Sequence, residues 1–292
     1  MGCFSGFLLL EWPLPWPSDL SEIPEIAPVT EVLAASGVRL QGLVPSAGDG
    51  LRRVISYRWP PATDGRAARY ERSEVAVDPS DTVTAALELL GAAPGAPGGP
   101  RRGHTADLPD EEVVDVLVCT HGRRDRCCGS LGTALAQELA GDDRPLGDGV
   151  RVWRTSHTGG HRFAATAIVL PHGTAWAFAD TDALRRVVTR TGELGDLLPR
   201  YRGCAGMGSR AVQALERAVL GEVGWPLFDR PRSGAELGGG LTELSVSDQS
   251  GTVTWEASVR VQREAPVPEC GLPIEMATKS EPELVVEGLR RR

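Results

Sequence analysis

Three of the six cysteines in this 292-residue chain lie within one decapeptide, CTHGRRDRCC, at residues 119–128. Cys119 follows a short apolar run that predicts a buried strand, and Cys128 leads into a segment with helical spacing that Ser130 is expected to cap. Both sulfurs would then lie near a helix N-terminus, where the peptide dipole favours thiolates. Thiolates bind metal ions, act as nucleophiles and exchange disulfides, so this loop is the first candidate for chemistry.

A second candidate is the pair of histidines in SHTGGHRFA, residues 156–164. His157 and His161 are four positions apart, and the two glycines between them predict a tight loop rather than a helix. This loop follows a strand predicted at 150–155, which in a parallel pairing lies beside the strand predicted at 113–118. Loops at the same ends of adjacent strands meet in space, so two thiolates and two imidazoles are expected to converge.

Two cysteines and two histidines allow several kinds of site. A structural zinc ion takes such ligands, although the eight residues between Cys119 and Cys128 exceed the usual two to four. A Rieske cluster also uses two Cys and two His, but Cys204 and Cys270 lack the companion histidine that a standard Rieske fold requires. A thiol enzyme would pair a cysteine with a histidine base, and nothing in the sequence distinguishes one histidine from the other as that base.

Three segments taken together resemble the sucrase/ferredoxin-like family, whose members are thioredoxin-like proteins: CTHGRRDRCCG, SHTGGHRFAATAIVLPHG and LLPRYRG. The resemblance covers roughly residues 5–205. It implies a 2Fe–2S cluster held by two cysteines nine positions apart and two histidines four apart. Those ligands fall on Cys119, Cys128, His157 and His161. Cys127 is an alternative to Cys128, but the nine-position spacing and the following Gly129 favour Cys128.

Other residues near the motifs are expected to have smaller roles. We expect His121 to be a neighbour of the ligands or an exposed loop residue. Arg124, Asp125 and Arg162 are expected in surface ion pairs, with orientation of the ligands as the alternative. We expect His104 and His172 to be solvated, and Cys3, Cys204 and Cys270 to be ordinary small side chains.

The middle of the chain predicts an α/β fold of the thioredoxin-like class, a central mixed sheet flanked by helices. Strand, helix, strand, hairpin and helix follow one another there, and residues 109–205 are the predicted ferredoxin domain. Residues 1–108 carry a similar β-α-β-β pattern, and GVRLQGLV at 37–44 echoes GVRVWRTS at 149–156. We hypothesise that this N-terminal part is a degenerate thioredoxin-like repeat without ligands.

Two Gly/Pro-rich segments, 91–103 and 230–240, predict breaks between these parts. Residues 206–292 are the predicted C-terminal α+β extension. It has a helix at 209–223 and an antiparallel hairpin within 242–262, and no catalytic motif.

Composition excludes several classes of partner. With 31 basic and 39 acidic side chains and no long basic run, nucleic acid is not an expected partner. The N-terminal apolar run is short and interrupted by Glu11, which argues against a signal peptide or a membrane span. We therefore expect a cytoplasmic protein whose cysteines are reduced, and the richness in Ala, Gly, Arg and Pro suggests a bacterial source. The oligomeric state is not indicated.

The predicted function is electron transfer by a His/Cys-ligated 2Fe–2S protein, an electron carrier rather than an enzyme. No dinucleotide-binding or phosphate-binding glycine motif is found, so separate redox partner proteins must supply and accept the electrons. An imidazole bound through one nitrogen keeps the other free to exchange a proton, which predicts coupled electron and proton transfer. The alternatives are a structural zinc-binding protein and a Cys/His thiol-dependent enzyme.

Overall fold

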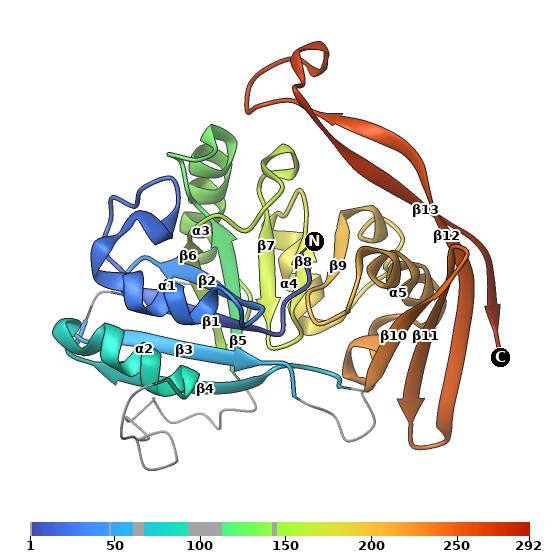
Figure 1. Ribbon diagram of the computed structural model, residues 1–292, viewed down its shortest axis with the longest axis horizontal. Coiled ribbons are helices and arrows are strands. Elements are labelled where there is room, and N and C mark those ends of the chain that lie inside the picture. Colours follow the sequence, from blue (N-terminus) through green and yellow to red (C-terminus); the bar gives the residue numbers. More distant parts are fainter. Residues whose placement is uncertain (1, 47, 61–66, 93–112, 142–144) are drawn as a thin grey trace.

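The computed structural model describes residues 2–46, 48–60, 67–92, 113–141 and 145–292. Its strands form a nine-stranded mixed sheet, in the order β4-β3-β1-β2-β6-β5-β7-β8-β9, and a four-stranded antiparallel sheet, β10-β11-β12-β13 (Figure 1). The first half of the large sheet and its helices are β1 (Gly6–Glu11), α1 (Ala27–Leu33), β2 (Val38–Leu43), β3 (Arg52–Arg58), β4 (Glu71–Val77) and α2 (Thr82–Leu90). The second half comprises β5 (Val114–Cys119), α3 (Thr133–Leu139), β6 (Val150–Thr155), β7 (Ala167–Leu170), β8 (Thr174–Trp176), α4 (Thr181–Thr189) and β9 (Tyr201–Cys204).

Four strands of each half have the same order and directions, and the second half has β9 in addition. β1 pairs with β2 in parallel and with β3 antiparallel, and β5 pairs with β6 in parallel and with β7 antiparallel. The second half has the element order of a thioredoxin-like fold, as the sequence predicts. The shared topology is what the repeat hypothesis requires, and superposition of the two halves stays a prediction.

The halves meet at a bend between β2 and β6, which pair through the single antiparallel couple Leu43–Thr155. Successive residues of a strand point to opposite faces, so each half buries both of its faces. Phe7 and Leu9 of β1 share a cluster with Leu117 of β5, between the two half-sheets. The alternate residues of β1 pack beneath α1 and α2, and those of β5 pack beneath α3 and α4. The layers are therefore helices, half-sheet, half-sheet and helices.

A buried carboxylate, Asp115 of β5, joins the two half-sheets across their interface. It accepts hydrogen bonds from the Tyr57 hydroxyl of β3, from Trp153 Nε1 at 2.6 Å and from Arg151 Nε at 2.7 Å. Arg151 also donates to Glu74 of β4 at 2.9 Å. Burial alone would raise the pKa of Asp115, but the Arg151 guanidinium and the hydrogen bonds hold it below its ordinary value. The halves are thus joined by a charged network as well as by apolar packing.

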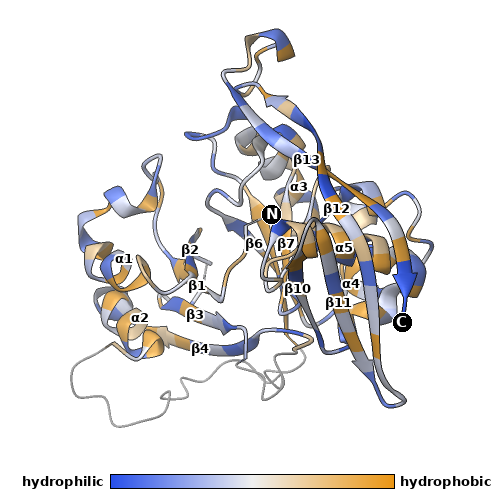
Figure 2. Cartoon of the chain, turned by 45° about the vertical axis from the view of Figure 1, so that its right-hand side comes forward, coloured by the Kyte–Doolittle hydropathy of each residue, from blue (hydrophilic) through white to orange (hydrophobic). Residues whose placement is uncertain are grey.

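The C-terminal extension has the predicted helix, α5 (Arg210–Val223), and the predicted hairpin. The Ser209 hydroxyl caps the helix by accepting from the Val212 amide at 3.2 Å, and Gly224 ends it with a φ of 77°. The strands of the extension are β10 (Arg232–Gly238), β11 (Leu241–Asp248), β12 (Gly251–Val267) and β13 (Lys279–Arg291). Figure 2 shows the alternation of polar and apolar residues along these strands.

One of the two predicted breaks is wrong for most of its length. β10 occupies much of residues 230–240, because its backbone pairs with β11 at the edge of the small sheet. The turn is confined to Gly239 and Gly240, which have positive φ, as does Gly238 at the end of β10. Residues 93–103 of the other predicted break lie outside the described residues. The domain boundaries at 108 and 205 stay predictions, although α5 shares one hydrophobic cluster with both sheets.

β12 and β13 continue past the end of β11 as a two-stranded arm, residues 259–286, which projects from the small sheet in Figure 1.

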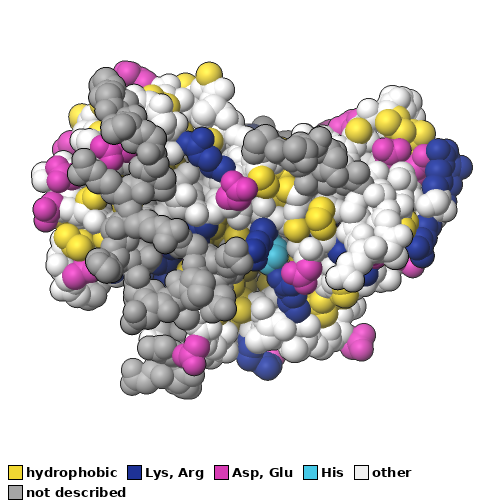
Figure 3. Space-filling view, turned by 90° about the horizontal axis from the view of Figure 1, so that it is seen from below, with side chains coloured by type: hydrophobic (Ala, Val, Ile, Leu, Met, Phe, Trp, Pro, Cys, Tyr) yellow, Lys and Arg dark blue, Asp and Glu magenta, His cyan; other side chains and the backbone are white. Residues whose placement is uncertain are grey.

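No helix in the described part of the chain is long and apolar enough to cross a membrane. On the face shown in Figure 3, acidic and basic side chains are intermixed, unlike the one-sided basic stripe that follows a phosphate backbone.

Candidate metal centre

The two predicted cysteine ligands lie side by side in the core. Cys119 is the last residue of β5 and Cys128 is the first residue of a π-helical turn, η4 (Cys128–Gly132), that continues into α3. Both thiols are free and buried, with 0% and 1% of their surface exposed. Their side chains lie close enough for each to shift the pKa of the other. The predicted strand-to-helix placement of both cysteines is therefore confirmed.

The π-helical turn explains how the helix comes so close to Cys119. We expected Ser130 to cap the helix, but the helix begins before it and Ser130 lies inside η4. At Gly132 the helix touches the end of β5, and a Cβ there would overlap the carbonyl oxygen of Cys119. Single π turns within helices are frequent at functional sites, and this one brings Cys128 against Cys119.

Gly132→Ala is expected to lower the free energy of unfolding by about 1–3 kcal/mol, because overpacking displaces either η4 or β5. It should also separate the two thiols. Urea denaturation measures the first effect. The matched control is Gly221→Ala in α5, where the added Cβ meets only ordinary contact at 3.4 Å and helix propensity favours alanine. Equal stability of the two variants would contradict close packing at residue 132.

His157 is oriented by a carboxylate. Its ring Nδ1 lies 2.9 Å from Oδ2 of Asp125, whose side chain is 8% exposed. The ring also contacts the Cys119 sulfur. Burial lowers the pKa of His157, but Asp125 and Cys119 together raise it above its ordinary value. A carboxylate on one ring nitrogen leaves the other available to a metal ion, as in histidines that bind metals.

The surroundings of Cys119 favour its thiolate. The Cys128 thiol, the His157 ring and the backbone of His121 and Thr158 all interact favourably with it. These interactions lower the pKa of Cys119 well below its ordinary value despite burial, and the same contact raises the pKa of Cys128. Thiolates on one tetrahedral metal ion lie roughly 3.7 Å apart for metal–sulfur bonds of about 2.3 Å. Two thiols in mutual contact therefore suit a shared ion.

The fourth predicted ligand is placed only by its backbone. His161 begins the short helix η5 (His161–Phe163), and its side chain lies outside the described residues. Gly159 and Gly160 have φ values of 93° and 76°, which confirms the tight loop. Among the side chains that the structure describes, no set of three or more His, Cys, Asp or Glu has the arrangement of a formed metal site. The four-residue ligand set therefore stays a prediction.

Asp125 is the residue of the candidate site that sequence reasoning undervalued. We expected a surface ion pair, but the residue is 6% exposed and contacts His157. The sequence did hold a signal for this contact, an acidic residue within the cysteine loop. Histidines that bind metals usually have a hydrogen-bond partner for their second ring nitrogen. Arg124 and Arg162 do form ion pairs, with Asp19 at 3.6 Å and with Glu281 at 3.3 Å.

The predictions for the remaining histidines and cysteines had mixed outcomes. His121 is buried, with its ring centroid 5.8 Å from that of Trp16. His172, expected to be solvated, is half-buried, and burial lowers its pKa to about 3. Cys270, expected to be an ordinary side chain, forms a disulfide with Cys127, so the expectation of reduced cysteines is wrong for this pair. His104 lies outside the described residues. Cys3 is an exposed free thiol and Cys204 a buried one.

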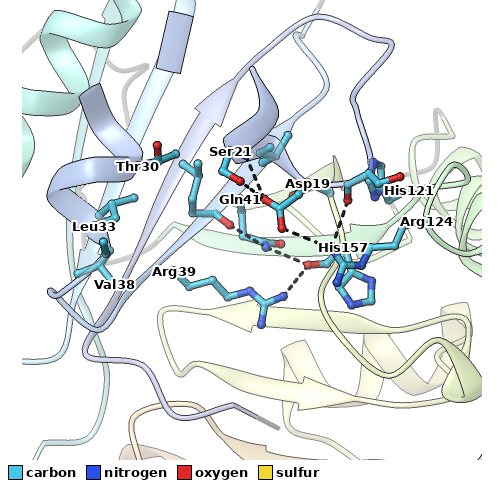
Figure 4. A pocket seen from close by; sticks show the side chains of 15 residues that line it. Asp19, Ser21, Thr30, Leu33, Val38, Arg39, Gln41, His121, Arg124 and His157 are labelled. Carbon is cyan, nitrogen blue, oxygen red and sulfur yellow. Dashed lines mark hydrogen bonds and ion pairs between the residues drawn. The ribbon is translucent and has the colours of Figure 1, made fainter. Parts of the chain in front are cut away.

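A cavity of about 380 Å³ lies beside His157, lined by α1, β2, the segment before α1 and the two candidate loops. In Figure 4, Arg39 and Gln41 point from β2 toward the backbone of His157. Their side-chain nitrogens donate to its carbonyl oxygen at 2.6 and 3.1 Å. The His157 side chain is 22% exposed. The N-terminal half thus fixes the histidine loop while leaving the ring accessible to solvent.

The family model of sucrase/ferredoxin-like proteins matches residues 10–203. No curated protein and no solved structure shows a match to the chain. The matched span begins in β1 and ends in β9, so it takes in both halves of the large sheet and both candidate loops, while the small sheet lies outside it. The chain therefore belongs to the sucrase/ferredoxin-like family.

Proposed function

We propose that this protein carries a 2Fe–2S cluster on Cys119, Cys128, His157 and His161 and serves as an electron carrier. The observation that supports it best is the contact of two buried thiols with a carboxylate-oriented imidazole, in which the Cys119 thiolate is favoured. Such sulfur and nitrogen donors suit iron in a mixed His/Cys site. When bound, the cluster supplies one-electron redox chemistry.

The chain's own residues would bind the cluster, orient its histidine ligand and shield the sulfurs from water. Backbone N–H groups and the close approach of η4 to β5 hold the sulfurs in a dry environment. Asp125 fixes the His157 ring from Nδ1, while Arg39 and Gln41 fix the backbone of His157. Separate redox proteins would donate and accept the electrons, since the sequence has no nucleotide-binding motif.

The test is the metal content of the purified protein. Iron and acid-labile sulfide in equal amounts, with a brown colour and visible absorption, are expected. One zinc ion in a colourless protein would instead favour the structural zinc site. Protein that binds neither after anaerobic reconstitution with iron and sulfide would refute the proposal.

A thiol-dependent enzyme is the second candidate, because Cys119, His157 and Asp125 have the order of a nucleophile, a base and the group that orients the base. Against it, the Cys119 sulfur belongs to a residue with 0% exposure, where a substrate carbonyl cannot reach it. Rapid alkylation of Cys119 by iodoacetamide in the native, metal-free protein would favour the enzyme. Slow alkylation supports the buried-ligand interpretation.

The midpoint potential is expected to fall as pH rises, by up to about 59 mV per pH unit for one proton per electron. The His157 Nδ1 gains affinity for its proton when an electron is added nearby, so the fall spans the pH range between the ring's pKa values in the two redox states. The Asp125 carboxylate raises the pKa of His157. Asp125→Asn should therefore move this range to lower pH.

Potentiometric titration from mildly acid to alkaline pH measures both effects. The control is Asp182→Asn, which replaces a carboxylate outside the site. It should leave the pH range over which the potential falls unchanged. A midpoint potential that is flat over the whole range in the unmodified protein would contradict proton coupling at His157, even with the cluster present.

A further inference from the structure

The Cys127–Cys270 disulfide joins two parts of the chain that are 143 residues apart. Cys127 immediately precedes the predicted ligand Cys128. Cys270 lies at the tip of the arm, residues 268–278, between β12 and β13. The Cys127 backbone N–H also points to the Cys270 sulfur at 3.0 Å. The arm is thus covalently attached beside the cysteine loop.

The arm also reaches the histidine loop. Arg162, next to His161, donates to the Pro266 carbonyl at 3.4 Å and to Glu281 at 3.3 Å. Glu281 belongs to β13 and its side chain is 43% exposed. An exposed ion pair of this kind contributes little to holding two elements together. The disulfide is therefore the strong link between the arm and the candidate metal centre.

The outer part of the arm has little support of its own. Val259, Leu284 and Val286 at its base pack with the main hydrophobic cluster. Beyond them, in the described part of the chain, residues 263–267 of β12 pair only with residues 279–283 of β13. A two-stranded hairpin is marginally stable without a third strand or a packed face. Its tip exposes the apolar side chains Leu272, Ile274 and Met276, by 41%, 55% and 58%. The position of the tip therefore depends on the disulfide and on the exposed contacts of Arg162.

We propose that the Cys127–Cys270 disulfide is a second redox site, a thiol–disulfide exchange site for dithiols, whose reduction releases the arm tip from the cysteine loop. This goes beyond the electron-carrier function and needs no cluster. Both cysteines are half-buried, and the residues on either side of Cys270 are exposed, so a reductant can reach that sulfur. Disulfides in proteins of reducing compartments are mostly transient bonds with such roles.

The exchange is a two-electron reaction. One thiolate of the dithiol attacks the Cys270 sulfur, which forms a mixed disulfide and breaks the bond to Cys127. The Cys127 sulfur leaves as a thiolate and takes up a proton. The second thiol of the reductant then attacks the mixed disulfide, so that the reductant becomes a cyclic disulfide and Cys270 becomes a thiol.

The test uses the full-length protein, with dithiothreitol and reduced thioredoxin as dithiol probes. Before reduction, N-ethylmaleimide should leave Cys127 and Cys270 unlabelled; after it, both should be labelled while the protein stays folded. A glutamate-specific protease that cuts after Glu275 should then act at least about fivefold faster, since the tip is no longer fixed. Peptide mass spectrometry reads out both results.

Cys270→Ser should be cut at the fast rate with or without dithiol, whereas the matched control Cys3→Ser, at an exposed free thiol, should keep the dependence on reduction. Labelling of both cysteines in unreduced protein, or a cleavage rate unchanged by reduction, would overturn the proposal. Neither readout requires iron. Running the iron-loaded and iron-free proteins in parallel therefore keeps a failure here separate from a failure of the cluster proposal.

Discussion

Four substitutions are each expected to reduce the iron content of the protein by about tenfold or more and to remove or shift its visible absorption: Cys119→Ser, Cys128→Ser, His157→Ala and His161→Ala. Even a group that only orients a metal ligand changes metal affinity by about 10–100-fold, and a direct ligand matters more. Packing cannot compensate, because the thiolate or imidazole bonds hold the iron themselves. Iron analysis and absorption spectra after reconstitution under identical conditions measure the loss.

Two cysteines outside the predicted ligand set serve as matched controls. Cys127→Ser removes a sulfur one position from Cys128, and Cys204→Ser removes a buried thiol at the end of β9. Both should keep the wild-type iron content. Loss of the spectrum in Cys127→Ser together with an intact spectrum in Cys128→Ser would transfer the ligand role to Cys127.

Glu216→Gln is expected to lower the free energy of unfolding by about 3–5 kcal/mol, because it leaves a buried guanidinium without its counter-charge. Glu216 of α5 and Arg232 of β10 are both 0% exposed, with Oε1 and Nε 2.7 Å apart. The second carboxylate oxygen accepts from the Tyr201 hydroxyl at 2.8 Å and from the Cys204 amide at 3.0 Å. One carboxylate therefore joins α5, strand β9 of the large sheet and strand β10 of the small sheet.

Chemical denaturation measures this effect, and Glu287→Gln is its control. Glu287 pairs with Arg260 on the surface, where both side chains are half-exposed and such a pair contributes about 0–1 kcal/mol. Replacing both buried partners, as in Glu216→Leu with Arg232→Met, should recover much of the lost stability because no buried charge remains. A loss in Glu216→Gln no larger than in Glu287→Gln would contradict the buried-pair interpretation.

The candidate site was predictable in part from local patterns. Cys119 at a strand end, Cys128 at a helix start and a glycine-bent loop after a parallel strand follow from periodicity and from backbone requirements. These features alone bring the two loops together, since β5 and β6 are parallel neighbours. The family match over residues 10–203 agrees with the resemblance read from the same segments.

Contacts between distant segments were not predictable. The burial of Asp115, Asp125 and Glu216 depends on side chains from other elements, and an acidic residue in a sequence is most often on the surface. The disulfide between Cys127 and Cys270 depends on the length and direction of the arm, which hydrogen bonding between β12 and β13 decides.

The sequence by itself determined the thioredoxin-like order of elements, the family and the two loops that carry candidate ligands, because periodicity, glycine placement and motif spacing are local properties. Only the tertiary structure decided which charged groups are buried, that η4 touches β5 at Gly132, and that the arm returns to the cysteine loop. Those outcomes are set by packing between residues far apart in the chain, where the free energy of burial and the geometry of neighbouring elements override local preference.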